Sequence, residues 1–138
     1  MNDEARIAIK SDDDLLVARQ QGRKLAIALG FTATEVTCIV TAISELTRNI
    51  LSYAGTGQVV LTSGNELSRS WITIVAQDEG PGIPDIKAAM MDGYSTSGGL
   101  GLGLPGVKRL MDDFQITSEM GQGTKVTVRK WREARATK

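Results

Sequence analysis

Glycine is distributed very unevenly along this chain, which limits where ordinary core structure can form. Ten of the 15 glycines fall between Gly80 and Gly123. Glycine lacks a Cβ, so it allows backbone angles closed to other residues and lets the backbone approach a ligand closely. A stretch so rich in glycine is either a flexible surface loop or a segment built around a bound molecule. The motifs on both sides of it bear on that choice.

The rest of the chain predicts helices and strands with one apolar face each. The clearest is a helix over residues 32–54, which starts with the capping box Thr32-Ala33-Thr34-Glu35 and has apolar residues at helical spacing. Further helices are expected over residues 12–29 and 105–112, and strands over residues 5–10, 58–63, 71–78, 114–117 and 125–131. The length predicts a single domain over residues 1–138, with a frayed tail over about residues 132–138.

Composition excludes several classes of protein. The 16 basic residues equal the 16 acidic ones, so the excess of Lys and Arg typical of nucleic-acid binders is missing. The absence of histidine excludes Ser-His-Asp hydrolases and His-ligated zinc, and the single Cys38 excludes an internal disulfide. The acidic start is unlike a signal peptide, and no apolar run approaches the roughly 20 residues that span a bilayer. We therefore expect a soluble cytoplasmic protein with no nucleic-acid or membrane partner.

Two common glycine-rich phosphate sites do not fit the sequence. Residues 101–106 match G-x-G-x-x-G, but a Rossmann site needs a strand directly before that run and an acidic residue about 20 positions later. Neither is present. A P-loop needs Gly-Lys followed by Ser or Thr, and the chain has no Gly-Lys pair. Both kinds of site are excluded.

A carboxylate and an amide lie one turn apart on the predicted helix 32–54. Glu45 and Asn49 are four residues apart and share a face, which the helical phase places on the polar side, away from the apolar residues. A solvated helix face is the simpler explanation. The alternative is that their oxygens point at a cation or a reacting group, since Mg²⁺ prefers hard oxygen ligands and needs few from the protein.

A second carboxylate falls on the core-facing side of a predicted strand. Alternation over residues 71–78 places Asp78 on the same face as Ile72, Ile74 and Ala76. A carboxylate there is costly unless a donor, such as the amino group of adenine, reaches it. An ordinary turn residue is the alternative.

A hydroxyl occupies a comparable position at the start of the last strand. Thr124 follows Gly121-Gln122-Gly123 and shares its face with Val126 and Val128, so it could assist Asp78 in contacting a base. A hairpin turn followed by a strand threonine is the alternative.

The order of these motifs resembles one family. Glu-x-x-x-Asn on a helix is followed by Asp-x-Gly-x-Gly after a strand, then by a Gly-Leu-Gly-Leu run and by Gly-x-Gly-Thr before a last strand. This order is similar to the ATP-binding module of gyrase, the large heat-shock chaperones, histidine kinases and MutL, over residues 5–131. The matching positions in its four boxes are Glu45 and Asn49; Asp78, Gly80 and Gly82; Gly99, Gly101 and Gly103; and Gly121, Gly123 and Thr124.

Within that superfamily the chain resembles the small serine kinases and anti-sigma factors of bacterial partner switching. It lacks the dimerisation helices and the phosphoacceptor histidine of histidine kinases. Its runs over residues 43–49, 93–101 and 104–112 are most similar to the switch kinases of the stressosome.

The resemblance implies a fold and a ligand. The fold is an α/β two-layer sandwich of the Bergerat type, in which helices cover one face of a mixed, mainly antiparallel sheet and ATP binds between the layers. Asp78 would accept a hydrogen bond from the adenine amino group, Thr124 would assist, and Asn49 would hold Mg²⁺ across the phosphates. The box glycines would bring the backbone close to the nucleotide, and those at positions 99, 101 and 103 would form a lid over the triphosphate.

The resemblance also implies catalytic roles. Glu45 would be the general base that deprotonates the serine hydroxyl of a partner protein. Arg48 would stabilise the transferring phosphoryl group, pair with Glu45 or an acidic partner, or be an ordinary surface arginine. Lys108, in the helix after the glycines, would reach a phosphate.

The function implied is that of an ATP-dependent protein-serine kinase. Its substrates would be STAS-domain regulators, namely a stressosome scaffold and an antagonist, and the released kinase would bind and activate a PP2C-type phosphatase. Two alternatives remain open: an anti-sigma factor with serine kinase activity, and an ATP-gated binding module without transfer. The intact Glu45 argues against the second alternative.

Overall fold

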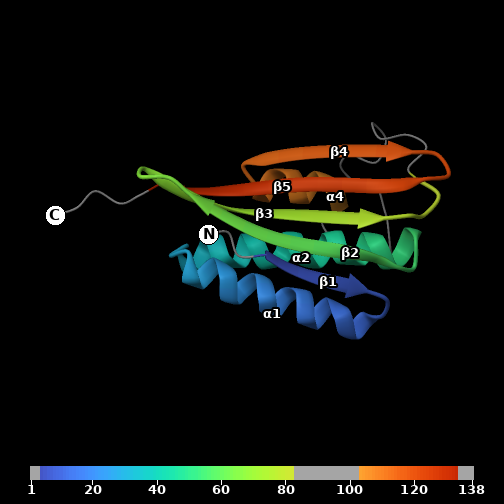
Figure 1. The fold of residues 1–138 in the computed structure, drawn as a ribbon, viewed down its shortest axis with the longest axis horizontal. Helices are drawn as coiled ribbons and strands as arrows, with labels where there is room; N and C mark the ends of the chain where they lie inside the picture. Colours follow the sequence, from blue (N-terminus) through green and yellow to red (C-terminus); the bar gives the residue numbers. More distant parts are fainter. Residues whose placement is uncertain (1–3, 83–102, 134–138) are drawn as a thin grey trace.

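A single sheet forms one layer of the molecule. The structure is a computed structural model that describes residues 4–82 and 103–133. The strands are β1 (Glu4–Ile9), β2 (Gly57–Asn65), β3 (Arg69–Asp78), β4 (Asp113–Glu119) and β5 (Gly123–Glu133). They lie in the order β1-β2-β3-β5-β4, and all four neighbouring pairs are antiparallel (Figure 1). The mainly antiparallel sheet is confirmed, and no parallel pair occurs among these described strands.

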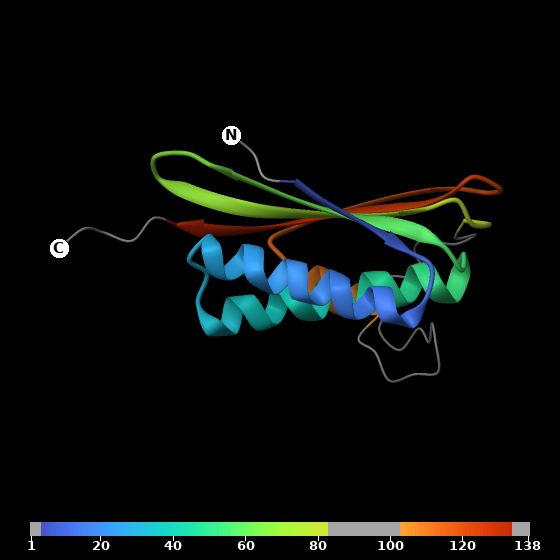
Figure 2. The ribbon, with the colours of Figure 1, turned by 60° about the horizontal axis from the view of Figure 1, so that its bottom comes forward.

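Helices form the second layer, on one face of the sheet. They are α1 (Asp12–Ala28), α2 (Ala33–Tyr53) and α4 (Gly103–Leu110). Figure 2 shows all three on the same side of the sheet, while the β2–β3 hairpin extends past the ends of α1 and α2. The predicted two-layer sandwich is confirmed. Within the described ranges, no helix has both the length and the apolar character needed to cross a membrane.

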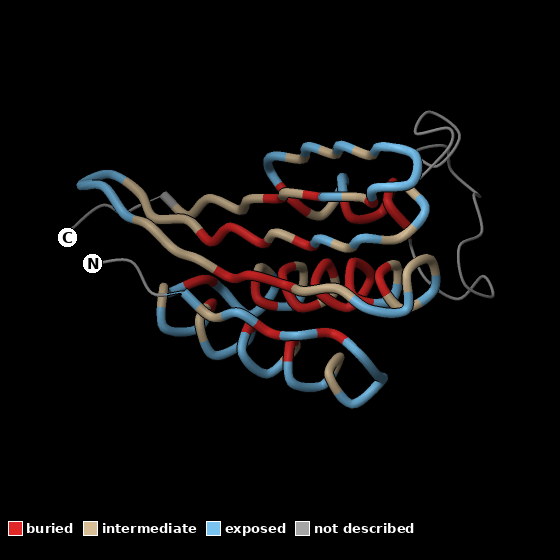
Figure 3. The backbone as a smooth tube through the Cα atoms, turned by 45° about the vertical axis from the view of Figure 1, so that its right-hand side comes forward, coloured by how far each residue is buried: buried red, intermediate tan, exposed pale blue. Residues whose placement is uncertain are grey.

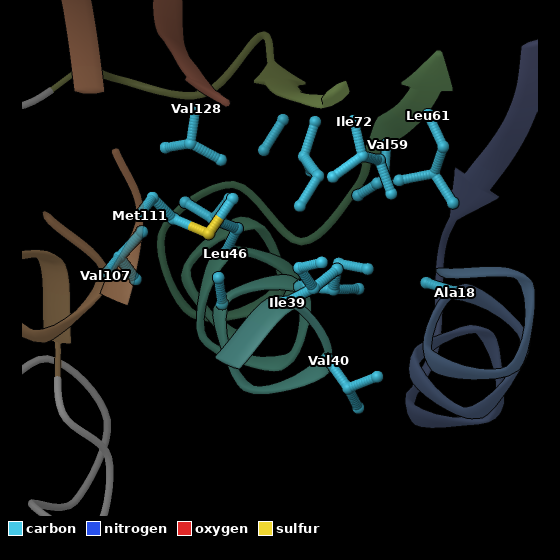
Figure 4. Packing of buried hydrophobic residues seen from close by; sticks show 14 of the residues in the cluster. Ala18, Ile39, Val40, Leu46, Val59, Leu61, Ile72, Val107, Met111 and Val128 are labelled. Atoms are coloured by element: carbon cyan, nitrogen blue, oxygen red, sulfur yellow. The ribbon is translucent and has the colours of Figure 1, made fainter. Parts of the chain in front are cut away.

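The core lies between the two layers, and α2 is at its centre. Alternation along β3 buries Ile72 and Ile74 completely against the helices, and Ile39 and Ile43 of α2 are also fully buried. Figure 3 shows buried residues concentrated on α2 and the central strands. Figure 4 shows Leu46 of α2 close to side chains from the sheet and from the segment around α4. Burying each such side chain contributes roughly 1.5–3 kcal/mol to folding.

Several boundaries differ from those predicted, by one or two residues. β2 and β3 pair with each other from Gly57 to Asn65, and β3 also pairs with β5 as far as Glu133. This extended pairing lengthens all three strands. It includes Arg132, which the sequence placed in the frayed tail and whose Nε donates to the Gly30 carbonyl at 2.7 Å. Residues 134–138 lie outside the described residues.

The N-terminus of α2 is anchored as predicted. The Thr32 hydroxyl accepts a hydrogen bond from the Glu35 amide at 3.2 Å, and Glu35 Oε1 accepts one from the Thr32 amide at 2.8 Å. Phe31 and Val36, on either side of this capping box, are both buried. The helix that carries Glu45 and Asn49 therefore begins at a defined residue.

We expect Thr32→Ala to lower the free energy of unfolding by about 1 kcal/mol, because it removes the acceptor for an amide at the start of α2. Thr37→Ala is the matched control on the same helix. Among the described residues, the partner of the Thr37 hydroxyl is the Ala33 carbonyl at 3.0 Å, a contact that adds little to helix stability. Urea denaturation measures both values, and equal losses would contradict an anchoring role for the capping box.

Candidate functional site

A hollow opens between the helices and the sheet where α2 ends, β3 ends and β5 begins. Its lining comes from four elements: Leu46, Asn49, Ile50 and Tyr53 of α2, Ala76 and Asp78 of β3, Leu104 of α4, and Thr124 and Val126 of β5. It has about 340 Å³ of empty space including its open mouth. The fold thus brings together Asn49, Asp78 and Thr124, which the sequence singled out separately.

Asp78 lies on the face that strand alternation predicted. It lines the hollow together with Ala76, and its Oδ1 accepts hydrogen bonds from the amides of Gly80 at 2.9 Å and Thr124 at 3.3 Å. Among the described residues, both of its hydrogen bonds fall on Oδ1. The carboxylate is therefore held in place by backbone through Oδ1, and none of the described residues bonds to Oδ2.

The nearby glycines allow backbone segments to pack closely around Asp78. Gly123 has φ +118°, and a Cβ on it would collide with the carbonyl of Asp78. A Cβ on Gly80 would lie 2.6 Å from the Cβ of Ala54, after the end of α2. The close approach that the structure shows at Gly80 is between segments of the protein itself. That Gly80 also lets the backbone pass close to a base stays a prediction.

The Thr124 hydroxyl has a partner that the sequence analysis missed. It lies 3.0 Å from the hydroxyl of Ser118, which faces Thr124 across the β4–β5 pair. Alternation along β4 could have identified Ser118, since it shares a face with Phe114 and Ile116. Tyr53, which also lines the hollow, was missed as well, although it lies one helical turn beyond Asn49.

Glu45 is buried, so the polar-side position that helical phase predicted for it is wrong, and the explanation as a solvated helix face is excluded for this residue. The residue is only 5% exposed. Its Oε1 accepts a hydrogen bond from the Gly103 amide at 3.2 Å, and its Oε2 accepts one from Arg48 Nη1 at 2.8 Å. Helical phase located the face that packs on the sheet, but α4 covers a second face of α2, which the pattern of α2 alone does not reveal.

Other polar residues on this part of α2 are buried too. Ser44 and Thr47 bond to the carbonyls of Val40 and Ile43, at 3.0 and 2.8 Å. These bonds satisfy the hydroxyls inside the helix itself. Glu45 differs from them, because its partners come from another helix and from a charged side chain.

The residues available for a metal ion are few. Asn49 is half-buried and lines the hollow, one turn after Glu45. In the part of the chain that the structure describes, no three His, Cys, Asp or Glu side chains gather as a metal site. A cation here would rest on the Asn49 oxygen and on oxygens of the ligand, a set that suits Mg²⁺.

The glycines predicted to form a lid, and Lys108, do not line the hollow of Asp78 in the part of the chain that the structure describes. Gly103 begins α4 with φ +68° and donates to Glu45, whereas Gly99 and Gly101 lie outside the described residues. Lys108 is exposed and lines a separate hollow with Phe114 and Arg129 rather than the hollow of Asp78. Its contact with a phosphate stays a prediction.

Gly82, after β3, and Gly121, in the β4–β5 turn, also have defined positions. Gly82 has φ +85°, and a Cβ on it would lie 2.6 Å from the Glu119 carbonyl. The Gly121 amide donates to the Pro81 carbonyl at 3.0 Å. These contacts tie the segment after β3 to the β4–β5 turn, beside the hollow.

Comparison with known proteins identifies the family. The model of the histidine kinase-, DNA gyrase B- and HSP90-like ATPases matches residues 35–134. The chain is 50% identical over 131 residues to the serine/threonine-protein kinase RsbT of Bacillus subtilis (strain 168), covering 95% of this chain and 98% of that protein. It is 31% identical over 104 residues to an anti-sigma F factor of Clostridium novyi (strain NT), covering 72% and 73% of the two chains.

A solved structure shows the same fold. The crystal structure of the RsbU and RsbW domains of a Mycobacterium tuberculosis protein matches with a TM-score of 0.62 at 18% identity, over 100% of this chain and 35% of that one. The chain thus spans about a third of that longer protein. The family model and the identity to RsbT agree with the hollow beside Asp78 and the buried Glu45. The chain belongs to the histidine kinase-, DNA gyrase B- and HSP90-like ATPase family and, within it, to the protein serine/threonine kinases related to RsbT.

Proposed function

We propose that this protein transfers the γ-phosphoryl group of ATP to a serine of STAS-domain regulators in a bacterial stress-signalling partner switch. When released from them, it binds and activates a PP2C-type phosphatase. The observation that carries the proposal is the placement of Asp78 and Asn49 on one hollow, with the buried carboxylate of Glu45 on the same helix as Asn49. Asp78 lines it with Oδ2 available, and Glu45 lies one turn before Asn49 of the same lining. The 50% identity to RsbT, which is named as a serine/threonine-protein kinase, supports the kinase activity.

The hollow suits an adenine ring. Apolar side chains such as Leu46, Ile50 and Val126 provide its walls, and Asp78 provides an acceptor at one side. A flat ring that buries apolar faces and donates through one amino group matches this combination. Thr124, held by Ser118, is the second polar group next to Asp78.

The phosphates would extend from the base toward Asn49 and the N-terminus of α4. Asn49 and phosphate oxygens would hold Mg²⁺, which when bound neutralises charge on the phosphates. Buried backbone amides at a helix start also favour negative charge. In the structure, the Gly103 amide at that helix start donates its hydrogen bond to Glu45 Oε1.

Glu45 is the proposed general base. It accepts the proton of the partner serine as the serine oxygen bonds to the γ-phosphorus and the bond from that phosphorus to the bridging oxygen of ADP breaks. Phosphoryl transfer depends mainly on positioning and charge stabilisation, so a single well-placed carboxylate suffices as a base. Its burial and its two hydrogen bonds give it a defined orientation.

An anti-sigma factor with kinase activity is the second candidate. It is favoured by the 31% identity to the anti-sigma F factor of Clostridium novyi. The chemistry at the hollow would be the same, and only the captured protein would differ. Recovery of a sigma factor in a pull-down, without a PP2C-type phosphatase, would support this candidate instead.

We expect Asp78→Asn to weaken ATP binding at least tenfold. The amide oxygen can keep the bonds from Gly80 and Thr124, but the amide nitrogen replaces the acceptor Oδ2 with a donor, which opposes the adenine amino group. Glu79→Gln, which removes an exposed charge at the next residue, is the control and should bind ATP normally. Calorimetric titration with Mg-ATP measures both, and unchanged affinity in Asp78→Asn would overturn the adenine assignment.

Gly123→Ala and Gly121→Ala form a matched pair. Both glycines have positive φ, but a Cβ at position 123 collides with the Asp78 carbonyl, whereas one at position 121 meets nothing within 4 Å. We expect Gly121→Ala to lose about 1–2 kcal/mol of stability from backbone strain. Gly123→Ala should lose more, because the collision adds to the strain, and it alone should weaken ATP binding. Urea denaturation and ATP titration provide the two readouts. Equal ATP affinities in the pair would argue against a role for this close approach in the site.

Transfer itself is tested with Glu45→Gln. Labelled γ-phosphate from Mg-ATP should appear on serine of a STAS-domain partner with the wild-type protein. The variant should bind ATP but transfer about 10²–10⁴-fold more slowly, the range for loss of a general base. Glu66→Gln, on an exposed turn, is the control. Absence of label with wild type despite ATP binding would refute the kinase proposal, and parallel loss of binding in Glu45→Gln would show a structural role.

A further inference from the structure

Arg48 makes an unusual ion pair with Glu45. Its Nη1 lies 2.8 Å from Glu45 Oε2, three residues earlier on α2. The side chain of Arg48 is 44% exposed, but that of Glu45 is 7% exposed. The pair thus connects a buried carboxylate to a cation at the surface.

The other ion pairs of residues 4–82 and 103–133 have a different character. Their carboxylates belong to Glu4, Glu66 and Asp112, and each is at least 44% exposed. Pairs of that kind contribute little, because water screens the exposed carboxylate. A carboxylate as buried as Glu45 depends on its partners, since losing one leaves a charge without compensation in the interior.

The two oxygens of Glu45 are held from two directions. Arg48, from the same helix, holds Oε2, and the Gly103 amide, at the start of α4, holds Oε1. Two bonds to different oxygens prevent rotation of the carboxylate plane. Each oxygen has a second lone pair, so these two bonds do not use up the capacity of the carboxylate to accept hydrogen bonds.

We propose that Arg48 is a positioning residue, which fixes the orientation of Glu45 and acts on the reaction only through it. This inference rests on the proposed function of Glu45 as the base. Arg48 is not part of the lining of the hollow, so it has no assigned contact with the base or sugar of ATP. A rate effect of Arg48 should therefore disappear when the Glu45 carboxylate is absent.

Four forms of the full chain test this: wild type, Arg48→Met, Glu45→Gln and the double variant. Arg48→Met keeps the aliphatic part of the side chain and removes the guanidinium. We expect it to lower kcat for transfer to the STAS-domain partner by about 10- to 100-fold, the scale of a misplaced catalytic group. The KM for ATP should stay within about twofold, because uniform binding is not affected.

The double variant distinguishes positioning from direct contact with the transferring phosphoryl group. If Arg48 acts through Glu45, adding Arg48→Met to Glu45→Gln changes kcat by less than about twofold, since the two effects are not independent. If Arg48 contacts the phosphoryl group itself, the two losses multiply. Labelled ATP and long incubations make the slow transfer of the Glu45→Gln background measurable.

Conservative replacement provides a second readout. Arg48→Lys keeps a cation one turn from Glu45 and should recover part of the lost kcat, though not all, because an ammonium lacks the planar donor geometry of a guanidinium. Arg23→Met, at an exposed position of α1, is the control for loss of a surface arginine and should leave kcat unchanged. Thermal unfolding of each variant shows whether equal fractions are folded.

The outcomes separate this inference from the proposed function. No transfer by wild type would refute the kinase proposal as a whole. Normal kcat in Arg48→Met, or multiplying losses in the double variant, would overturn the positioning role and leave Glu45 as the base. A fall in kcat that tracks the folded fraction, with no recovery in Arg48→Lys, would assign Arg48 to stability alone.

Discussion

The burial of α2 on several sides is the constraint on which the rest of this structure depends. The helix packs against the sheet, against α1 and against α4 at once. Its apolar residues Ile39, Ile43 and Leu46 anchor it in the core, and this fixes the rotation of the helix about its axis. That rotation places Asn49 on the hollow and Glu45 under α4. A change in the packing of α2 would therefore move both groups together.

A second constraint acts at the other side of the hollow. Asp78 connects the end of β3 to the start of β5 through the Thr124 amide, and to its own following turn through the Gly80 amide. These bonds make the carboxylate part of the fold as well as part of the site. Gly123 permits the close approach, since a side chain there would push the two strands apart. The site is thus held by backbone contacts on the sheet side and by helix packing on the other.

Glu45 illustrates how function and stability can oppose each other. An apolar residue between α2 and α4 would avoid the cost of a buried charge. The chain instead keeps a carboxylate there and supplies it with an arginine and a backbone amide. Such an arrangement is expected where the charge takes part in function. Functional sites are also the places where a fold accepts a residue that lowers its stability.

The sequence by itself determined the two-layer architecture, the three helices and five strands of residues 4–82 and 103–133, and the family. Hydrophobic spacing, caps and the order of the glycine motifs are all local or linear features. It also placed Asp78 correctly, because alternation along a strand is a property of the strand alone. It did not determine the surroundings of Glu45 or the partner of Thr124. Whether a helix face is solvated depends on what packs against it, and Glu45 is separated from Gly103 by 58 positions in the chain. Only the tertiary structure decided that α4 covers that face, because the close packing of two helices is set by the whole core and not by the pattern of either one.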